Sequence, residues 1–165
     1  MWLGVPEYPR HLPAFDYIGS YAYFLTFCTF ERSRLFVTHE AVRIVHEQIL
    51  RATEADTFAI HAHCYMPDHA HFVVEGSRDN SDLKRCISRA KQYSGFYFKR
   101  AIGRRLWQRY GYERVLRDEE ERVASIRYVI ENPIRANLTK SPLDYPYWGS
   151  SISSREELLD HLRVA

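Results

Sequence analysis

The chain has 165 residues, the length of a single domain, and its content of 45% hydrophobic and 27% charged residues excludes a largely disordered protein. The net charge of +2, taken as a whole-chain value, gives no reason to expect a nucleic-acid partner. No apolar run approaches the roughly 20 residues that span a bilayer, and the sequence shows no signal peptide. We therefore expect no membrane association and a cytoplasmic location.

Apolar periodicity and turn residues divide the chain into strands and helices. An irregular N-terminal arm at 1–19 precedes a strand at 21–30 whose two faces are both apolar, which indicates a central strand. Thr38 is a suitable N-cap for a helix that continues to 55. The further elements are strands at 58–66 and 69–76, a helix at 82–101, a strand at 113–116, a helix at 118–131 that ends at Asn132-Pro133, and a short helix at 154–162 within a tail at 141–165.

The order of these elements predicts the fold class. Strand, helix, hairpin, helix and strand is the order of a ferredoxin-like α+β sandwich, in which helices pack on a central antiparallel sheet. The sequence contains no repeat and no low-complexity stretch, so we predict a single domain over residues 1–165.

Charges are distributed unevenly along the chain. Residues 84–117 contain eleven basic side chains and one acidic side chain, so this segment carries +10 and the remainder of the chain −8. Seven aromatic residues are interleaved with these cations. Cations neutralise a phosphate backbone and flat rings stack on bases, so the segment indicates nucleic-acid binding. A solvated basic helix face above core aromatics is the alternative interpretation.

Four of the eight histidines lie between positions 61 and 71. A two-residue turn between the two strands makes cross-strand partners sum to 135, which places His69 and His71 on the same face as Cys64. The same register places His61 and His63 on the opposite face. One pair can therefore present two imidazoles to an ion or a phosphate, and the other pair would be structural or exposed.

Several interpretations of the pair formed by His69 and His71 are possible. Histidines in a strand are most often hydrogen-bonded structural residues. A zinc site that adds Cys64 would need a fourth ligand, which the sequence does not offer at a customary spacing. Two imidazoles with open positions are better suited to a catalytic Mg²⁺ or Mn²⁺ that an oxygen ligand completes.

Tyr128 has an unusual position on its predicted helix. At 100° per residue it falls nearly opposite the apolar stripe that contains Ile126 and Val129, and Asn132 lies one turn further along the same side. Tyr128 is therefore turned away from the core face of its helix and has an amide beside it. It is either an ordinary exposed tyrosine or a functional residue.

Five segments form a recognisable combination. They are MPDHAHFVV at 66–74, LWQ at 106–108, YERVLRDE at 112–119, YVIENPIRANL at 128–138 and YPYWGSS at 145–151. Together they resemble the HUH single-tyrosine transposases, and among these the REP-associated tyrosine transposases of bacteria, over about residues 8–151. The chain departs from the family at Ala70, where an aliphatic residue is frequent, and at Asn137, where a glycine is common.

The resemblance implies an HUH endonuclease fold and a transposase activity. At the matching positions it implies that Tyr128 is the nucleophile and that His69, His71 and Asn132 bind a divalent cation, Mg²⁺ or Mn²⁺. The tyrosine would attack a phosphodiester, expel a 3′-hydroxyl and form a 5′-phosphotyrosine intermediate, which another 3′-hydroxyl can reverse. The implied substrate is single-stranded DNA beside the hairpin of a repetitive extragenic palindrome (REP).

Charge and family position together suggest a set of residues that contact DNA. They are Arg10, Arg104, Arg105, Trp107, Arg109 and Arg114. Two rival functions stay open: a domesticated module that binds DNA or RNA without cleaving it, and a metal-dependent nuclease that activates water and forms no covalent intermediate. The sequence is compatible with a monomer or a homodimer.

Overall fold

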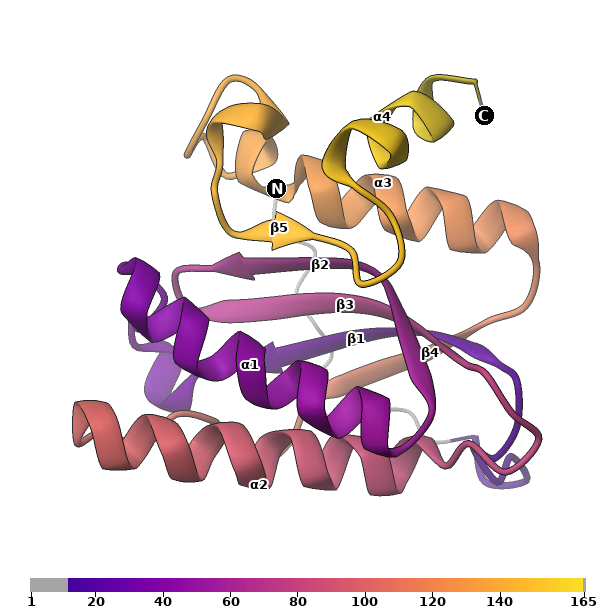
Figure 1. The fold of residues 1–165 in the computed structure, drawn as a ribbon, viewed down its shortest axis with the longest axis horizontal. Helices are drawn as coiled ribbons and strands as arrows, with labels where there is room; N and C mark the ends of the chain where they lie inside the picture. Colours follow the sequence, from indigo (N-terminus) through magenta and orange to yellow (C-terminus); the bar gives the residue numbers. More distant parts are fainter. Residues whose placement is uncertain (1–11, 165) are drawn as a thin grey trace.

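Within residues 12–164, which the computed structural model describes, five antiparallel strands form one sheet with helices on both of its faces (Figure 1). The strand order is β4-β1-β3-β2-β5. The strands are β1 (Ala22–Cys28), β2 (Phe58–Met66), β3 (His69–Gly76), β4 (Tyr112–Leu116) and β5 (Trp148–Gly149).

Helices α1 and α2 cover one face of the sheet, and α3 and α4 lie over the other face (Figure 1). The helices are α1 (His39–Ala55), α2 (Leu83–Ile102), α3 (Glu119–Arg135) and α4 (Arg155–Val164), with short 3₁₀ turns η1 (Phe30–Arg32) and η2 (Pro142–Asp144). This arrangement confirms the predicted α+β sandwich with a central antiparallel sheet. None of the described helices combines the length and the apolar character needed to cross a membrane.

Side-chain caps define where the long helices begin. Thr38, Asp82 and Asp118 each accept a hydrogen bond from the backbone N–H three residues later, at 3.2, 3.0 and 2.8 Å. Gly103, in the left-handed region at φ +80°, ends α2. These residues explain why the predicted bounds lie close to the observed ones.

The end of α3 corrects the prediction that the helix stops at 131. The helix continues through Pro133 to Arg135. It ends in a Schellman motif, in which the N–H of Asn137 donates to the Ile134 carbonyl at 2.9 Å and the N–H of Leu138 to the Pro133 carbonyl at 2.9 Å. Asn137 has a φ of +56°, a conformation that asparagine tolerates well, so it replaces the glycine that is common in the family.

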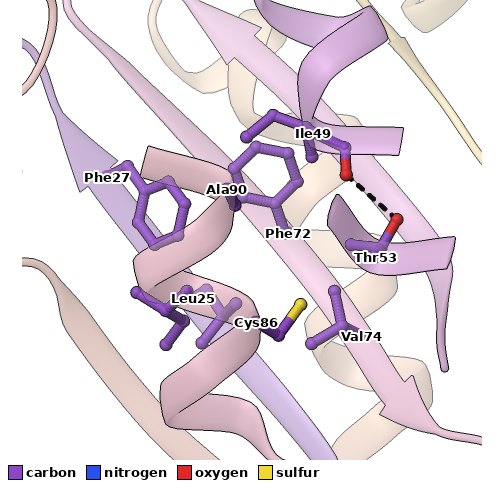
Figure 2. Close-up of a pocket in the computed structure, with 9 residues that line it drawn as sticks. Leu25, Phe27, Ile49, Thr53, Phe72, Val74, Cys86 and Ala90 are labelled. Carbon is purple, nitrogen blue, oxygen red and sulfur yellow. Dashed lines mark hydrogen bonds between the residues drawn. The ribbon is translucent and has the colours of Figure 1, made fainter. Parts of the chain in front are cut away.

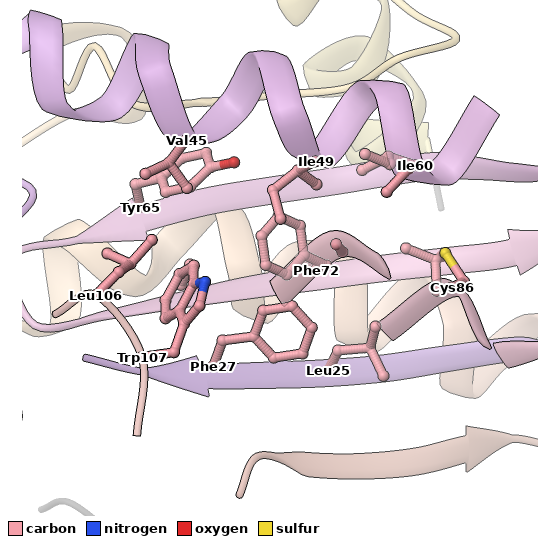
Figure 3. Packing of buried hydrophobic residues seen from close by; sticks show 14 of the residues in the cluster. Leu25, Phe27, Val45, Ile49, Ile60, Tyr65, Phe72, Cys86, Leu106 and Trp107 are labelled. Atoms are coloured by element: carbon pink, nitrogen blue, oxygen red, sulfur yellow. The ribbon is translucent and has the colours of Figure 1, made fainter. Parts of the chain in front are cut away.

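The face of the sheet under α1 and α2 carries the larger apolar cluster (Figure 3). Phe27 and Phe72 lie at its centre with ring centroids 5.3 Å apart. Trp107, from the loop at 103–111, packs on Phe27 and on Phe36 at 5.6 Å in each case. The loop is therefore anchored to the core although it contains many charged residues.

A small space remains between α1, α2 and the sheet (Figure 2). Its lining is apolar apart from Thr53, and the Thr53 hydroxyl donates to the Ile49 carbonyl within α1 at 3.1 Å. Because the one polar group that lines it is satisfied within its own helix, the space is a packing gap with no means of orienting a ligand.

The hairpin register confirms one prediction and corrects another. Cys64 pairs with His71 in the predicted register, so the His69 and His71 side chains lie on the face under α3. A β-bulge between Ile60 and Ala62 shifts the register near the start of β2. His61 consequently faces α3, where its Nε2 lies 2.6 Å from Glu75 Oε2, and the prediction that it shares a face with His63 is wrong.

Candidate active site

His69 and His71 lie side by side on β3 with ring centroids 4.7 Å apart. Each Nδ1 atom already has a protein partner: Thr26 Oγ1 lies 2.8 Å from that of His71, and Asp68 Oδ1 lies 2.7 Å from that of His69. The Asp68 carboxylate accepts from Nδ1 and so fixes the tautomer of His69, and both partners fix the orientation of their imidazole. The remaining ring nitrogen, Nε2, is therefore the ligand atom that each histidine can offer.

Asp68 is itself held in place by neighbouring residues. Arg32 contacts its Oδ2 through Nε at 3.0 Å and Nη2 at 2.9 Å, and the Thr29 N–H donates to the Asp68 carbonyl at 3.0 Å. Burial alone would raise the pKa of Asp68, but the hydrogen bonds from His69 and Arg32 outweigh this effect and lower the pKa to about 2. The carboxylate therefore stays ionised and keeps His69 oriented.

His71 is buried in the sheet, and burial lowers its pKa well below the ordinary value. The neighbouring positive charges of His69, when it is protonated, and of Arg135 act in the same direction. His71 is consequently neutral near pH 7, the form in which an imidazole coordinates a metal ion.

Tyr128 projects from α3 beside this pair. Its ring centroid lies 5.8 Å from those of His71 and Phe24, in edge-to-face geometry in both cases. The Arg135 guanidinium, two turns later on α3, lies 3.9 Å from the ring centroid and donates a hydrogen bond to the Tyr128 carbonyl. The side chain is 47% exposed, so its hydroxyl is accessible from outside although its ring is held on two sides.

Asn132 is placed level with His69 by the direction of α3. The helix runs antiparallel to β3, since Arg122 near its start contacts Glu75 at 2.9 Å and Tyr128 lies beside His71. From Tyr128 to Asn132 the helix advances about 6 Å, and from His71 back to His69 the strand spans about the same length. Asn132 therefore lies level with His69. Asn132 is buried, and its Nδ2 has no hydrogen-bond partner among the described residues.

These donors can be tested against the expected divalent cation. Among the described residues, His, Cys, Asp and Glu side chains form no group of three that could hold a metal ion. A site would therefore consist of the two Nε2 atoms and the amide of Asn132, with its remaining positions open to phosphate or water oxygens. This donor set fits a catalytic ion with open positions.

The structure argues against the zinc alternative. Cys64 is fully buried, and burial raises the pKa of its thiol far above the ordinary value. Among the described residues, Cys64 also joins no group of three His, Cys, Asp or Glu side chains that could hold a metal ion. Cys64 instead packs with Met66 and Val73 in the apolar cluster under α3.

The residues predicted to bind DNA fall into different environments. Arg104, Arg105 and Arg109 are exposed in the loop at 103–111. Arg114 is exposed on β4 opposite Phe24, on the side of α3, where it donates to Ser125 Oγ at 3.2 Å. Arg10 lies outside the described residues.

Trp107 requires a correction. Only 6% of the residue is exposed, and its Nε1 donates to Ser94 Oγ at 2.8 Å inside the larger cluster. The structure therefore makes Trp107 a packing residue of the loop and not the base-stacking residue that the sequence suggested.

Sequence reasoning assigned no role to the residues that orient the site. They are Thr26, Arg32, Asp68 and Arg135. Arg135 could have been found from its position seven residues after Tyr128, which is two turns of helix on the same side. Thr26 gives no such signal, because only the pairing of β1 with β3 brings it to His71.

Comparison with known proteins identifies the family to which the chain belongs. The family described as IS200-like transposases matches residues 18–132, more than half of the chain. The chain belongs to this family of transposases.

Relatives within the family agree with the resemblance to the REP-associated branch. A Haemophilus influenzae protein named as a REP-associated tyrosine transposase is 24% identical over 145 residues, which cover 80% of this chain and 81% of that protein. The solved structure of a REP-associated tyrosine transposase bound to a REP hairpin matches with a TM-score of 0.70 and 23% identity, covering 87% of this chain and 82% of the other.

A second solved structure, described as a transposase from Deinococcus radiodurans, matches with a TM-score of 0.52 and 20% identity. The match covers 72% of this chain and 94% of that chain. Both structural matches support the same fold.

Proposed function

We propose that this transposase cleaves and rejoins single-stranded DNA beside REP-like hairpins through a 5′-phosphotyrosine intermediate. The observation that carries the proposal is the position of Tyr128, which is accessible yet held against the histidine pair. The relative that was solved with a REP hairpin supports this choice of substrate.

The chain's own residues would divide the reaction between them. Tyr128 Oη attacks phosphorus and loses its proton, while the P–O3′ bond breaks and the leaving 3′-oxygen takes up a proton. Arg135 holds the tyrosine ring and places a positive charge beside the phosphate. Because the bond energy is kept in the phosphotyrosine, a second 3′-hydroxyl can reverse the step and join two strands.

His69, His71 and Asn132 would hold a divalent cation, Mg²⁺ or Mn²⁺, next to this tyrosine. Thr26 and Asp68 keep the two Nε2 atoms directed away from the sheet by engaging each Nδ1. When bound, the cation withdraws charge from the non-bridging phosphate oxygens and so favours attack by an oxygen nucleophile.

The proposal is tested by incubating end-labelled hairpin DNA with the protein and Mg²⁺ or Mn²⁺ and separating the products on a denaturing gel. We expect a protein–DNA adduct linked to the 5′ end, which Tyr128→Phe abolishes. Tyr21→Phe is the matched control, because Tyr21 is 45% exposed and lies away from the site.

The two rival functions give different products in this assay. Cleavage that persists in Tyr128→Phe with no adduct would identify a nuclease that uses water. Tight binding with no cleavage by the unmodified chain would identify a domesticated binding module.

A further inference from the structure

A second cationic feature lies between α2 and the loop at 103–111. It is a recess of about 690 Å³, including its open mouth. Its polar lining consists of Lys91, Lys99, Arg105, Arg109, Gln92 and Gln108. No acidic residue lines it within the described part of the chain, so the recess has a concentrated positive charge.

Lys91 is a partly buried cation whose charge is only partly offset by the electrostatic attraction of Glu113. Its Nζ donates to the Gln108 carbonyl at 3.3 Å and lies 5.1 Å from the Phe27 ring centroid. Burial lowers its pKa to about 8, and no carboxylate forms an ion pair with it among the described residues. A bound anion would supply the missing partner and raise the pKa again.

Two exposed aromatic residues are neighbours of residues that line the recess. Phe96 is 60% exposed and lies one helical turn after Gln92 on α2. Tyr110 is 53% exposed on the loop, with the Arg109 guanidinium 5.3 Å from its ring centroid. Cations in a groove with accessible rings on its rim are the combination that binds single strands, since phosphates pair with the cations and bases stack on the rings.

Gly95 keeps this part of α2 open. A Cβ atom at this position would lie 3.9 Å from Trp107 Cδ1, so a side chain would fit sterically but would occupy the recess. Glycine within a helix costs about 0.5–1 kcal/mol relative to alanine. Its presence here therefore fits a role in leaving space.

The recess lies at the same end of β1 as the candidate active site. Trp107 forms an isolated bridge with Thr29, and the Gln108 N–H donates to the Cys28 carbonyl at 3.1 Å. Cys28 in turn pairs with His69. The recess lies beside α2 and the histidines face α3, so a DNA strand that passes from the site to the recess would run around this end of the sheet.

We propose that this recess binds the unpaired strand of the substrate that flanks the hairpin, with phosphates on the four basic residues and bases stacked on Phe96 and Tyr110. The identity of the strand rests on the proposed function. The recess itself is a binding site separate from the residues that carry out cleavage.

The test measures DNA binding without cleavage, by fluorescence anisotropy. The protein carries Tyr128→Phe and the buffer contains EDTA, so that neither the tyrosine hydroxyl nor a divalent cation is present. Two labelled DNAs are compared: a blunt hairpin, and the same hairpin with single-stranded extensions. Lys99→Glu should weaken binding of the extended hairpin about tenfold and reduce its salt dependence, while binding of the blunt hairpin changes little. Arg100→Glu is the matched control, because it makes the same charge change at the next residue, which does not line the recess.

A second pair of variants tests stacking without changing charge. Phe96→Leu should weaken binding of the extended hairpin several-fold, whereas Tyr21→Leu, at an exposed aromatic residue just before β1 and far from the recess, should not. Equal effects of Lys99→Glu and Arg100→Glu, or equal loss of the blunt and extended hairpins, would overturn the proposal.

The outcome can be separated from that of the proposed function. Loss of the extended hairpin in Lys99→Glu, combined with no adduct in the unmodified chain, would leave the recess in place and remove the covalent mechanism. Adduct formation by the unmodified chain, combined with no effect of Lys99→Glu on binding, would support the covalent mechanism and remove the recess as a binding site.

Discussion

The two faces of the sheet differ in how they use the same strand. On β3, Phe72 and Val74 point into the apolar cluster under α1 and α2, whereas His69 and His71 point towards α3. Strand alternation thus lets one eight-residue element stabilise the core with one face and present the histidines of the proposed site on the other. The helix pair provides a well-packed support, and α3 supplies the tyrosine and amide that face the histidines.

The largest expected effect concerns the α3 face. Tyr128→Phe removes the hydroxyl of the proposed nucleophile and should lower strand cleavage by about 10³-fold or more, because phenylalanine has no oxygen to attack phosphorus. The free energy of unfolding should change by less than about 0.5 kcal/mol, because the hydroxyl is at the surface. Gel quantification of cleavage and urea unfolding measure the two quantities, and a large loss of stability would break the separation between the faces.

The opposite face should show the reverse pattern. Phe72→Ala removes a fully buried ring from the larger cluster and should reduce the free energy of unfolding by about 3–5 kcal/mol. The folded fraction should retain its affinity for Mn²⁺, because Phe72 points away from the histidines. Urea denaturation and calorimetric Mn²⁺ titration at low temperature check the two statements; a lost Mn²⁺ site in folded protein would contradict them.

Orientation of the histidines gives an intermediate effect. Thr26→Val removes the partner of His71 Nδ1 and should weaken Mn²⁺ binding by about 10–100-fold. Thr53→Val, a buried threonine on the α1 side, is the matched control and should leave the affinity unchanged. Calorimetric titration distinguishes them, and equal affinities would show that Thr26 has no positioning role.

The smallest effect is a dependence of stability on pH. Burial lowers the pKa of His46 and His63, which stack at 4.2 Å on the α1 side. The unfolded chain therefore binds protons below about pH 6.5 that the folded chain excludes, so stability is complete above this pH and falls as the pH decreases. Each histidine contributes a slope of up to about 1.4 kcal/mol per pH unit.

Removing one of these two buried histidines should weaken the dependence of the unfolding free energy on pH. We expect His63→Leu to lose part of the decline in unfolding free energy between pH 7 and pH 5, as measured by urea denaturation. His161→Asn, at an exposed position on α4, is the control and should retain the full decline. An unchanged slope in His63→Leu would contradict the assignment.

The elements and the main register could be predicted because local signals determine them. Caps mark the helix starts, and the two-residue turn alone fixes which histidines share a face with Cys64. The bulge beside His61 leaves no mark in composition, since it is one extra residue in a continuous strand. β5 was not predicted either, because two residues are too few to show a period.

Other errors arose where distant parts of the chain meet. Trp107 is an aromatic residue in a basic segment, which suggests base stacking. Its contacts with Ser94 and Phe27 instead place it in the core. The prediction that α3 ends before Pro133 was wrong. The turn that ends α3 is formed around Asn137, two residues after the last helical residue, Arg135. In the site, the tyrosine and the histidine pair were visible in sequence, while the residues that orient them became visible only through strand pairing.

The central claim is that Tyr128 becomes covalently attached to DNA. Tryptic digestion of the adduct formed with hairpin DNA, followed by mass spectrometry after nuclease trimming, tests it directly. Cleavage after Arg127 and Arg135 releases the peptide YVIENPIR, in which Tyr128 is the sole tyrosine. We predict a nucleotide mass on this peptide, and a modified peptide that contains a different tyrosine, or cleaved DNA with no modified peptide, would contradict the account.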